Sequence, residues 1–206
     1  MRRTLYYCIP IAVALISLSS FAMGDDLFDK IEKELSSAAM VTLKVEVINR
    51  SKIFNSADTS AGDISIAGDG RYSAHLNDDI YLFDGKCIWE FSAENNQATK
   101  QCLKDGEKFE NRLFFLKDLD KHYASQVIHK KTQYLLTLRN KKSASLPDSL
   151  TVHLNSRLGL ISKINYRDLN NDLNEVIIKK QSLFNRVDTT SFQIRLPDST
   201  EIINLP

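Results

Sequence analysis

The 206-residue chain has little excess charge and no apolar run of membrane-spanning length beyond its N-terminal segment. Its net charge is +1, and because Arg2 and Arg3 supply two positive charges, the rest of the chain carries −1. A chain without a basic field does not attract phosphate backbones, so we expect no nucleic-acid partner. The hydrophobic content of 43% and the charged content of 26% are typical of a globular protein, and the length favours one domain.

Motifs for catalysis and metal binding are also absent. The sequence contains no Gly-x-Ser-x-Gly turn and no phosphate-binding loop. Asp78-Asp79 and the acidic segment 168–172 lack the EF-hand spacing and are typical of turns. The four histidines are not spaced as metal ligands; they are His75, His122, His129 and His153. We therefore expect no enzyme activity, no metal site and no cofactor.

The N-terminus has the pattern of a secretory signal peptide. Two arginines precede the apolar run Leu5–Leu18, and small residues suited to cleavage follow it. The run is short for a membrane span. We expect cleavage of residues 1–24, which leaves residues 25–206 as a soluble periplasmic domain; an uncleaved anchor is the alternative. Cys8 lies within the apolar run rather than at the cleavage point, which argues against lipidation there.

Cysteine is scarce, and only Cys87 and Cys102 remain after such processing. Cys87–Phe91 and Ala98–Cys102 are predicted to pair as a hairpin that places the two cysteines opposite each other. A disulfide that closes a loop of about 15 residues contributes roughly 3 kcal/mol in the chain-entropy model. An oxidising compartment favours this bond, and two unpaired buried cysteines are the alternative.

The stretch Gly62–Leu103 consists of short strands with short links. Such strands pair antiparallel, because a parallel partner needs a crossover of about a dozen residues. Alternation in Ile64–Ile66 and Tyr72–Leu76 predicts one apolar and one polar face. Ile80–Phe83 and Cys87–Phe91 are apolar on both faces, so they are either covered on both sides or in contact with an apolar ligand.

The remaining periodicity predicts helices at residues 27–35 and 109–123 and a loop at residues 49–61. Further strands are predicted at Met40–Ile48, Ser125–His129, Gln133–Arg139, Leu150–Asn155, Ile161–Leu169, Asn174–Lys180 and Ser191–Leu196. This order predicts an α+β fold in which two or three helices lie on one face of a single long antiparallel sheet.

An ordered set of short features resembles the LolA-type outer-membrane lipoprotein carriers. The features are Gly62-Asp63-Ile64, Tyr72, the Asp84-Gly85-Lys86 turn before Trp89, Gln97-Ala98-Thr99, the strand Leu158–Ile164 and the closing segment Phe192–Pro197. No single feature is specific, and their order over most of the mature chain carries the resemblance. It implies a curved sheet that forms an unclosed half-barrel, with helices covering a concave apolar face and enclosing a cavity.

The same resemblance implies a function and a set of site residues. The function is a monomeric periplasmic carrier that takes lipoprotein acyl chains from an inner-membrane lipoprotein-releasing ABC transporter to an outer-membrane receptor. Arg71 is the candidate latch for the helical lid, since Gly68 and Asp69 occupy the family's usual Arg-Pro positions. The candidate cavity residues are Ile64, Ile66, Tyr72, Leu76, Leu82, Trp89 and Phe91, and for each of them plain core packing is the alternative.

Two other functions compete with carriage. One is a lipid-binding or envelope-sensing module of the same fold that acts by protein–protein interaction, which a permanently filled core would favour. The other is a small exported hydrolase, which the lack of a visible nucleophile–base set disfavours.

Overall fold

One α-helix and twelve strands account for most of the described chain. The structure, a computed structural model, describes residues 26–104, 122–129, 132–139, 146–168 and 170–206. The helix is α1 (Asp26–Ser37), and a short 3-10 helix, η2 (Thr189–Phe192), precedes the last strand. The strands are β1 (Met40–Ser51), β2 (Ser56–Ala67), β3 (Tyr72–Leu76), β4 (Asp79–Phe83), β5 (Cys87–Ser92), β6 (Gln97–Cys102), β7 (Tyr123–His129), β8 (Gln133–Leu138), β9 (Ser149–Asn155), β10 (Leu160–Arg167), β11 (Leu173–Phe184) and β12 (Glu201–Leu205).

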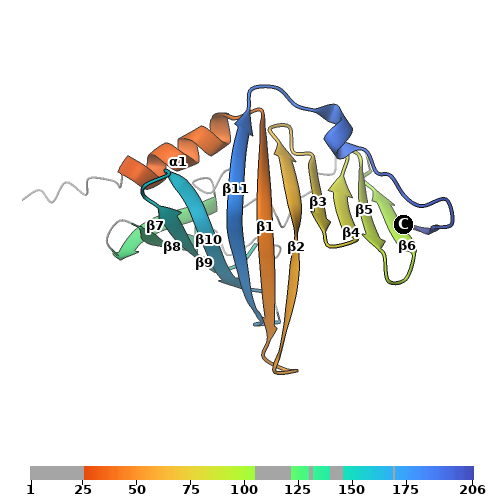
Figure 1. The fold of residues 1–206 in the computed structure, drawn as a ribbon, viewed down its shortest axis with the longest axis horizontal. Helices are drawn as coiled ribbons and strands as arrows, with labels where there is room; N and C mark the ends of the chain where they lie inside the picture. Colours follow the sequence, from red (N-terminus) through yellow and green to blue (C-terminus); the bar gives the residue numbers. More distant parts are fainter. Residues whose placement is uncertain (1–25, 105–121, 130–131, 140–145, 169) are drawn as a thin grey trace, which may run out of the picture.

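All twelve strands form one curved sheet in the order β12-β6-β5-β4-β3-β2-β1-β11-β10-β9-β8-β7. The two edge strands, β12 and β7, lie at opposite ends of the sheet, so it does not close into a barrel (Figure 1). Neighbours pair antiparallel except β12 and β6, which are parallel. The α+β fold with one unclosed, mostly antiparallel sheet is therefore confirmed.

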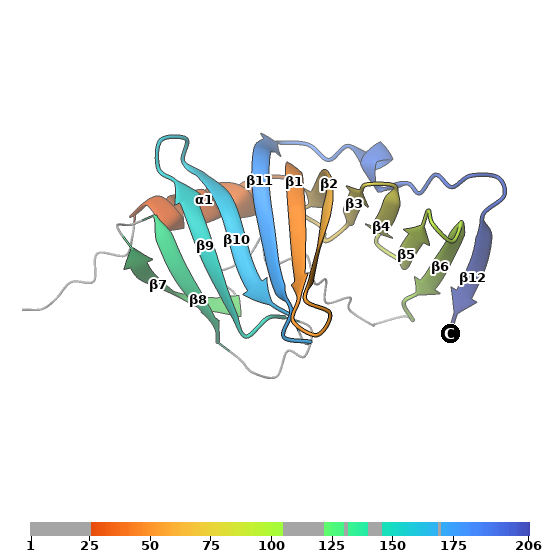
Figure 2. The ribbon, with the colours of Figure 1, turned by 60° about the horizontal axis from the view of Figure 1, so that its bottom comes forward.

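Helix α1 lies across one face of this sheet, which we call the helix face (Figure 2). Phe28, Ile31 and Leu35 recur at helical spacing and are buried, whereas Lys30 and Lys33 between them are exposed. The second predicted helix, residues 109–123, lies outside the described residues apart from its last two. Tyr123, which ends that prediction, is instead the first residue of β7.

The predicted loop at residues 49–61 is wrong, because β1 and β2 form a long hairpin joined at residues 52–55. The sequence suggested a loop since the residues are small and polar. Backbone pairing on both sides of β1, rather than burial of side chains, holds these residues in strands. Asn49, for example, pairs with Asp58 of β2 and with Asn174 of β11. This hairpin extends beyond the other strands at one end of the sheet (Figure 1).

The predicted strand at Ser191–Leu196 is also wrong. Asp188 caps η2 by accepting a hydrogen bond from the Thr190 backbone N–H (3.0 Å), and this side-chain contact favours a turn over an extended chain. The final strand is β12, which pairs with β6 after a connection long enough to permit a parallel arrangement.

Most buried apolar side chains form one core between α1 and the helix face. A smaller cluster of Met40, Ala67 and Phe192 lies on the opposite face, which we call the outer face. Within the described ranges, no helix is long and apolar enough to cross a membrane.

Candidate ligand-binding site

The strand register places the seven residues that the sequence predicts to line a cavity on two different faces of the sheet. Residues that pair across neighbouring strands point to the same face, and successive residues alternate. Ile66 pairs with Tyr72, and Gly62 pairs with Leu76, so those side chains lie on the helix face. Ile64, Ile66, Tyr72 and Leu76 therefore share the helix face, whereas Leu82, Trp89 and Phe91 share the outer face. The structure does not bring the seven residues into one cavity.

The three outer-face residues are held in place by contacts within the protein. Leu82 is 1% exposed and Phe91 is buried. The Trp89 ring lies under the Lys100 ammonium group (4.7 Å to the ring centroid), and its Nε1–H donates to the Asp84 carboxylate (3.3 Å). The three side chains are thus held by core packing, a hydrogen bond and a cation–π pair within the protein. We therefore look for a ligand site on the helix face.

On the helix face, α1 closes tightly over the sheet. The Phe28 ring stacks on Tyr134 of β8, with ring centroids 4.9 Å apart, and Ile64 and Ile66 belong to the same core. Leu35 and Val41 line a remaining cavity of about 10 Å³ together with Leu43, Ile66, Ile161, Ile178 and Gln181. That volume is about what one water molecule needs, so an acyl chain fits under α1 only after the helix moves.

A much larger pocket opens where β10 ends and β11 begins, away from α1. Its volume is about 670 Å³, within the range of small-molecule sites. It is lined by Leu146, Pro147, Asp148, Ser149, Tyr166, Arg167, Asp168, Asn170, Asn171 and Asn174. Tyr166 and Asn174 point to the helix face, because they pair with Leu150 and with Asn49, respectively. The pocket is therefore continuous with the face that α1 covers further along.

Hydrogen bonds hold the polar wall of this pocket. Asn174 Nδ2 donates to the Asp168 carboxylate (3.3 Å), and Asn49 Nδ2 donates to Asn174 Oδ1 (3.0 Å). Arg167 Nη1 donates to the Asn171 carbonyl (2.8 Å). Burial, together with the nearby Asp168 carboxylate, raises the pKa of Tyr166, so its hydroxyl stays protonated at neutral pH. The wall offers amide groups together with the charged groups of Asp148, Arg167 and Asp168 beside apolar surface, which suits an amphipathic ligand.

Sequence reasoning missed this pocket. The signal available was the segment 168–172, which was interpreted as a turn. It does form one, since the Asp168 carboxylate accepts from the backbone N–H groups of Asn170 (2.9 Å) and Asp172 (3.0 Å). Because the opposite wall comes from residues 146–149, only the fold shows that the turn borders a pocket.

Arg71, the candidate lid latch, contacts other parts of the chain. Its guanidinium forms an ion pair with Asp69 (2.7 Å) and lies over the Phe192 ring (5.2 Å to the centroid). The hydrogen bond from Arg71 lowers the pKa of the Asp69 carboxyl and raises the pKa of the guanidinium. These contacts attach Arg71 to the C-terminal segment rather than to α1.

Tyr72 lies on the helix face beside Phe83, with ring centroids 6.4 Å apart. Burial is the main reason that the pKa of Tyr72 rises to about 12.

The structure joins Cys87 to Cys102 by a disulfide in the predicted register, with Phe91 opposite Ala98.

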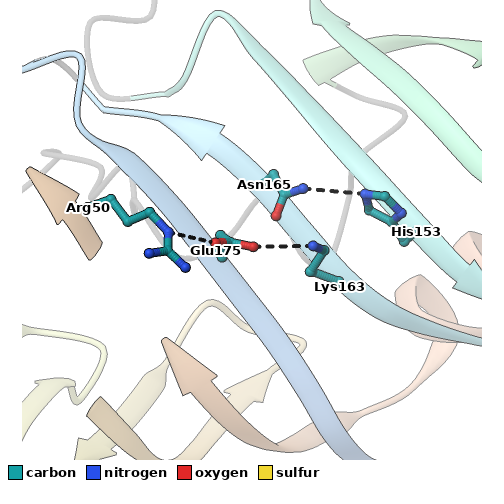
Figure 3. Close-up of polar contacts among 5 residues, drawn as sticks. All are labelled: Arg50, His153, Lys163, Asn165 and Glu175. Carbon is teal, nitrogen blue, oxygen red and sulfur yellow. Dashed lines mark hydrogen bonds and ion pairs between the residues drawn. The ribbon is translucent and has the colours of Figure 1, made fainter. Parts of the chain in front are cut away.

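Polar side chains form contacts across the outer face of β9–β11 (Figure 3). Glu175 accepts from Arg50 Nε (3.0 Å) and from Lys163 Nζ (3.2 Å), and Asn165 Nδ2 lies 3.3 Å from His153 Nε2. The hydrogen bonds from Arg50 and Lys163 lower the pKa of Glu175. Among the described residues, no group of three or more His, Cys, Asp or Glu side chains is arranged to hold a metal ion.

Comparison with protein-family models gives no match, and comparison with curated protein sequences gives none. Solved structures do match. An uncharacterised conserved protein from Thermus thermophilus is similar at 11% identity and a TM-score of 0.49, over 87% of this chain and 97% of that one.

A LolA superfamily protein from Nitrosomonas europaea matches at 8% identity and a TM-score of 0.42, over 81% of this chain and 97% of that one. A putative outer-membrane lipoprotein-sorting protein domain from Vibrio parahaemolyticus matches at 9% identity and a TM-score of 0.46, over 82% and 95%. All three identities are at most 11% and all three TM-scores are below 0.5, which is too low to support a conclusion about the family or function of this chain.

Proposed function

We propose that this protein binds acyl chains on the helix face of its sheet and carries lipoproteins through the periplasm. Residues 1–24 act as a cleaved signal peptide, and residues 25–206 are the mature domain. An inner-membrane ABC transporter that releases lipoproteins loads the protein, and an outer-membrane receptor unloads it. The LolA-type pattern in the sequence motivates the choice of cargo and partners.

One observation carries the proposal: a separate helix, α1, covers the apolar face of an open sheet. Burial of the side chains of Phe28, Ile31 and Leu35 contributes roughly 1.5–3 kcal/mol each, or about 5–9 kcal/mol together. An acyl chain of about 14 methylenes gains roughly 10 kcal/mol on burial. The two are of similar size, so a chain could displace α1, and α1 could help to expel the chain on delivery.

The pocket where β10 ends and β11 begins supplies a point of entry for the acyl chain. It is already open, it lies on the helix face, and its wall combines Tyr166 and Leu146 with the amide of Asn174. In this proposal, the polar end of the cargo stays at that wall while the acyl chain extends toward α1. Ile64, Ile66, Tyr72 and Leu76 remain candidate cargo contacts, because they share this face.

Weakening the lid tests the proposal. In Ile31→Ser and Leu35→Ser, α1 loses buried apolar contacts, so a fluorescent palmitoylated peptide should bind about ten-fold more tightly than to the wild type. Affinity is measured by fluorescence titration. Lys33→Ser changes an exposed residue of the same helix and should leave the affinity unchanged.

Two results would contradict the proposal. If the peptide without its palmitoyl group binds equally well, the site does not recognise acyl chains. If the wild type and both lid variants fail to bind the acylated peptide, carriage is excluded.

The second function is an envelope module that acts through a protein partner rather than through carriage. The observation in its favour is the close packing beneath α1, where Phe28 stacks on Tyr134 and the cavity beside Leu35 measures about 10 Å³. Absence of acyl binding in the titration above, with the folded state intact, would favour this function.

A further inference from the structure

The turn between β1 and β2 exposes two large apolar side chains side by side. Ile53 is 75% exposed and Phe54 is 80% exposed. These are the highest exposures among the large apolar side chains that the structure describes. Water contact at such residues is unfavourable, and nothing in the fold of the hairpin requires them to be apolar.

The backbone of this turn is held by polar contacts that leave both apolar side chains free to point outward. The Phe54 N–H donates to Ser51 Oγ (3.4 Å), and Asn55 takes a left-handed conformation (φ 49°). The Lys52 N–H donates to the Asp172 carboxylate (2.9 Å), which ties the turn to the segment beside the pocket. Hydrogen bonds therefore hold the backbone of this turn, which projects from the sheet.

We propose that this turn inserts Ile53 and Phe54 into a lipid surface. A stable protein–protein interface buries about 800 Å² on each partner, and two adjacent side chains on a narrow turn fall well short of that area. A lipid surface sets no such minimum, because apolar side chains at a projecting tip enter the acyl region individually. The size and shape of the tip therefore fit a membrane better than a protein groove.

The charges around the turn indicate how it binds. Arg50 is paired with Glu175 (3.0 Å), and the Asp172 carboxylate accepts from the Lys52 backbone N–H (2.9 Å), so a carboxylate lies near each of the two cationic residues beside the turn. Attraction to anionic lipid is thus weak, and apolar insertion dominates. Asp168, Asn170 and Asn171 of the same corner line the pocket, so insertion would hold the pocket mouth near the lipid. That last consequence rests on the proposed function; the membrane contact itself does not.

A tryptophan reporter tests insertion directly. The chain has one tryptophan, Trp89, so Trp89→Phe provides a silent background. In that background, Phe54→Trp should shift its emission to the blue on addition of phosphatidylethanolamine–phosphatidylglycerol vesicles and should be quenched by brominated acyl chains. The matched control is Leu158→Trp, at a 64% exposed position in the turn that joins β9 to β10. It should show neither effect.

Vesicle binding by the full chain provides the second measurement. The double substitution Ile53→Ser and Phe54→Ser should weaken the tip-dependent binding by roughly 10- to 100-fold, whereas Leu158→Ser should not. Binding by the wild type should persist at high salt.

Several outcomes would overturn the inference. They are an unshifted Phe54→Trp signal, equal signals at positions 54 and 158, loss of binding at high salt, or loss of acyl-peptide binding in solution by the double variant. Failure of the wild type to bind the acylated peptide, with Phe54→Trp still quenched by lipid, would contradict the proposed function alone.

Discussion

The two halves of the sheet keep their cores on opposite faces. From β8 through β11 to β1 and β2, most buried side chains lie on the helix face beneath α1, as Leu136 and Ile164 do, and Met40 and Ala67 at the ends of β1 and β2 are buried on the outer face. In β4 to β6 the deeply buried side chains, such as Leu82 and Ala98, lie on the outer face. On the helix face of that half, Tyr81 and Glu90 are exposed.

One sheet thus serves two structural purposes. The half beneath α1 offers an apolar face that displacement of the helix would uncover. The half near the disulfide has its most buried side chains on the outer face. On that same face, next to this half, η2 of the C-terminal segment places Phe192 against Met40 of β1 and Ala67 of β2. A ligand that displaces α1 would leave that second core in place.

Among the substitutions that compare the two faces of the sheet, removal of the Phe192 ring from the outer-face cluster with Met40 and Ala67 should have the largest effect on stability. Phe192 is 3% exposed, so Phe192→Ala should lower the free energy of unfolding by about 3–5 kcal/mol. Phe184→Ala, at a position that is 42% exposed, should change it by no more than about 0.5 kcal/mol. Urea denaturation measures both. Equal losses in the two variants would mean that Phe192 does not anchor the C-terminal segment.

Removal of the disulfide should have a somewhat smaller effect on stability, confined to the half that contains β4 to β6. The Cys87→Ser and Cys102→Ser double variant frees a loop of 15 residues, which in the chain-entropy model costs about 3 kcal/mol. Hydrogen exchange should quicken in β5 and β6 before it does in β9 and β10. Equal quickening in all four strands would show that the halves unfold as one unit and would remove the basis of the comparison.

The smallest effect on the free energy of unfolding is expected on the outer face of β9–β11, in the half of the sheet beneath α1. Glu175→Gln removes two ion pairs, with Arg50 and Lys163, worth roughly 0.5–1 kcal/mol in total. Because the pKa of Glu175 is lowered on folding, its contribution is full above the ordinary pKa of about 4.3 and is lost as pH falls through the lower folded value.

The difference in unfolding free energy between wild type and Glu175→Gln should therefore be constant near neutral pH and should shrink below about pH 4. Thermal unfolding measured across this pH range checks the sign. A difference that grows on acidification would mean that the ion pairs are not what Glu175 contributes.

The strands from Tyr72 to Cys102 could be predicted from the sequence to within a residue. Alternation with a period of two defines them, and short turns such as Asp84-Gly85-Lys86 separate them. The pairing of Cys87 with Cys102 followed from the same hairpin register. Local pattern and local pairing agree in this region, so no tertiary contact had to be known.

The faces of β4 and β5 could not be predicted, and this limited the prediction of the site. Both faces of these strands are apolar, so the pattern cannot distinguish Leu82 on the outer face from Phe83 on the helix face. The extension of β1 and β2 could not be predicted because its residues are polar. Strand β12 could not be predicted because its partner, β6, lies about a hundred residues away in the sequence.

That distant pairing has a consequence for biogenesis. While the chain emerges from a ribosome or a translocation pore, β6 has no partner on its outer edge until residues 201–205 follow. An unpaired edge is a template for strands of other chains, so the nascent protein carries an aggregation hazard until residues 201–205 pair with β6. A route of synthesis that keeps the chain extended until residues 201–205 have been made would avoid exposing this edge.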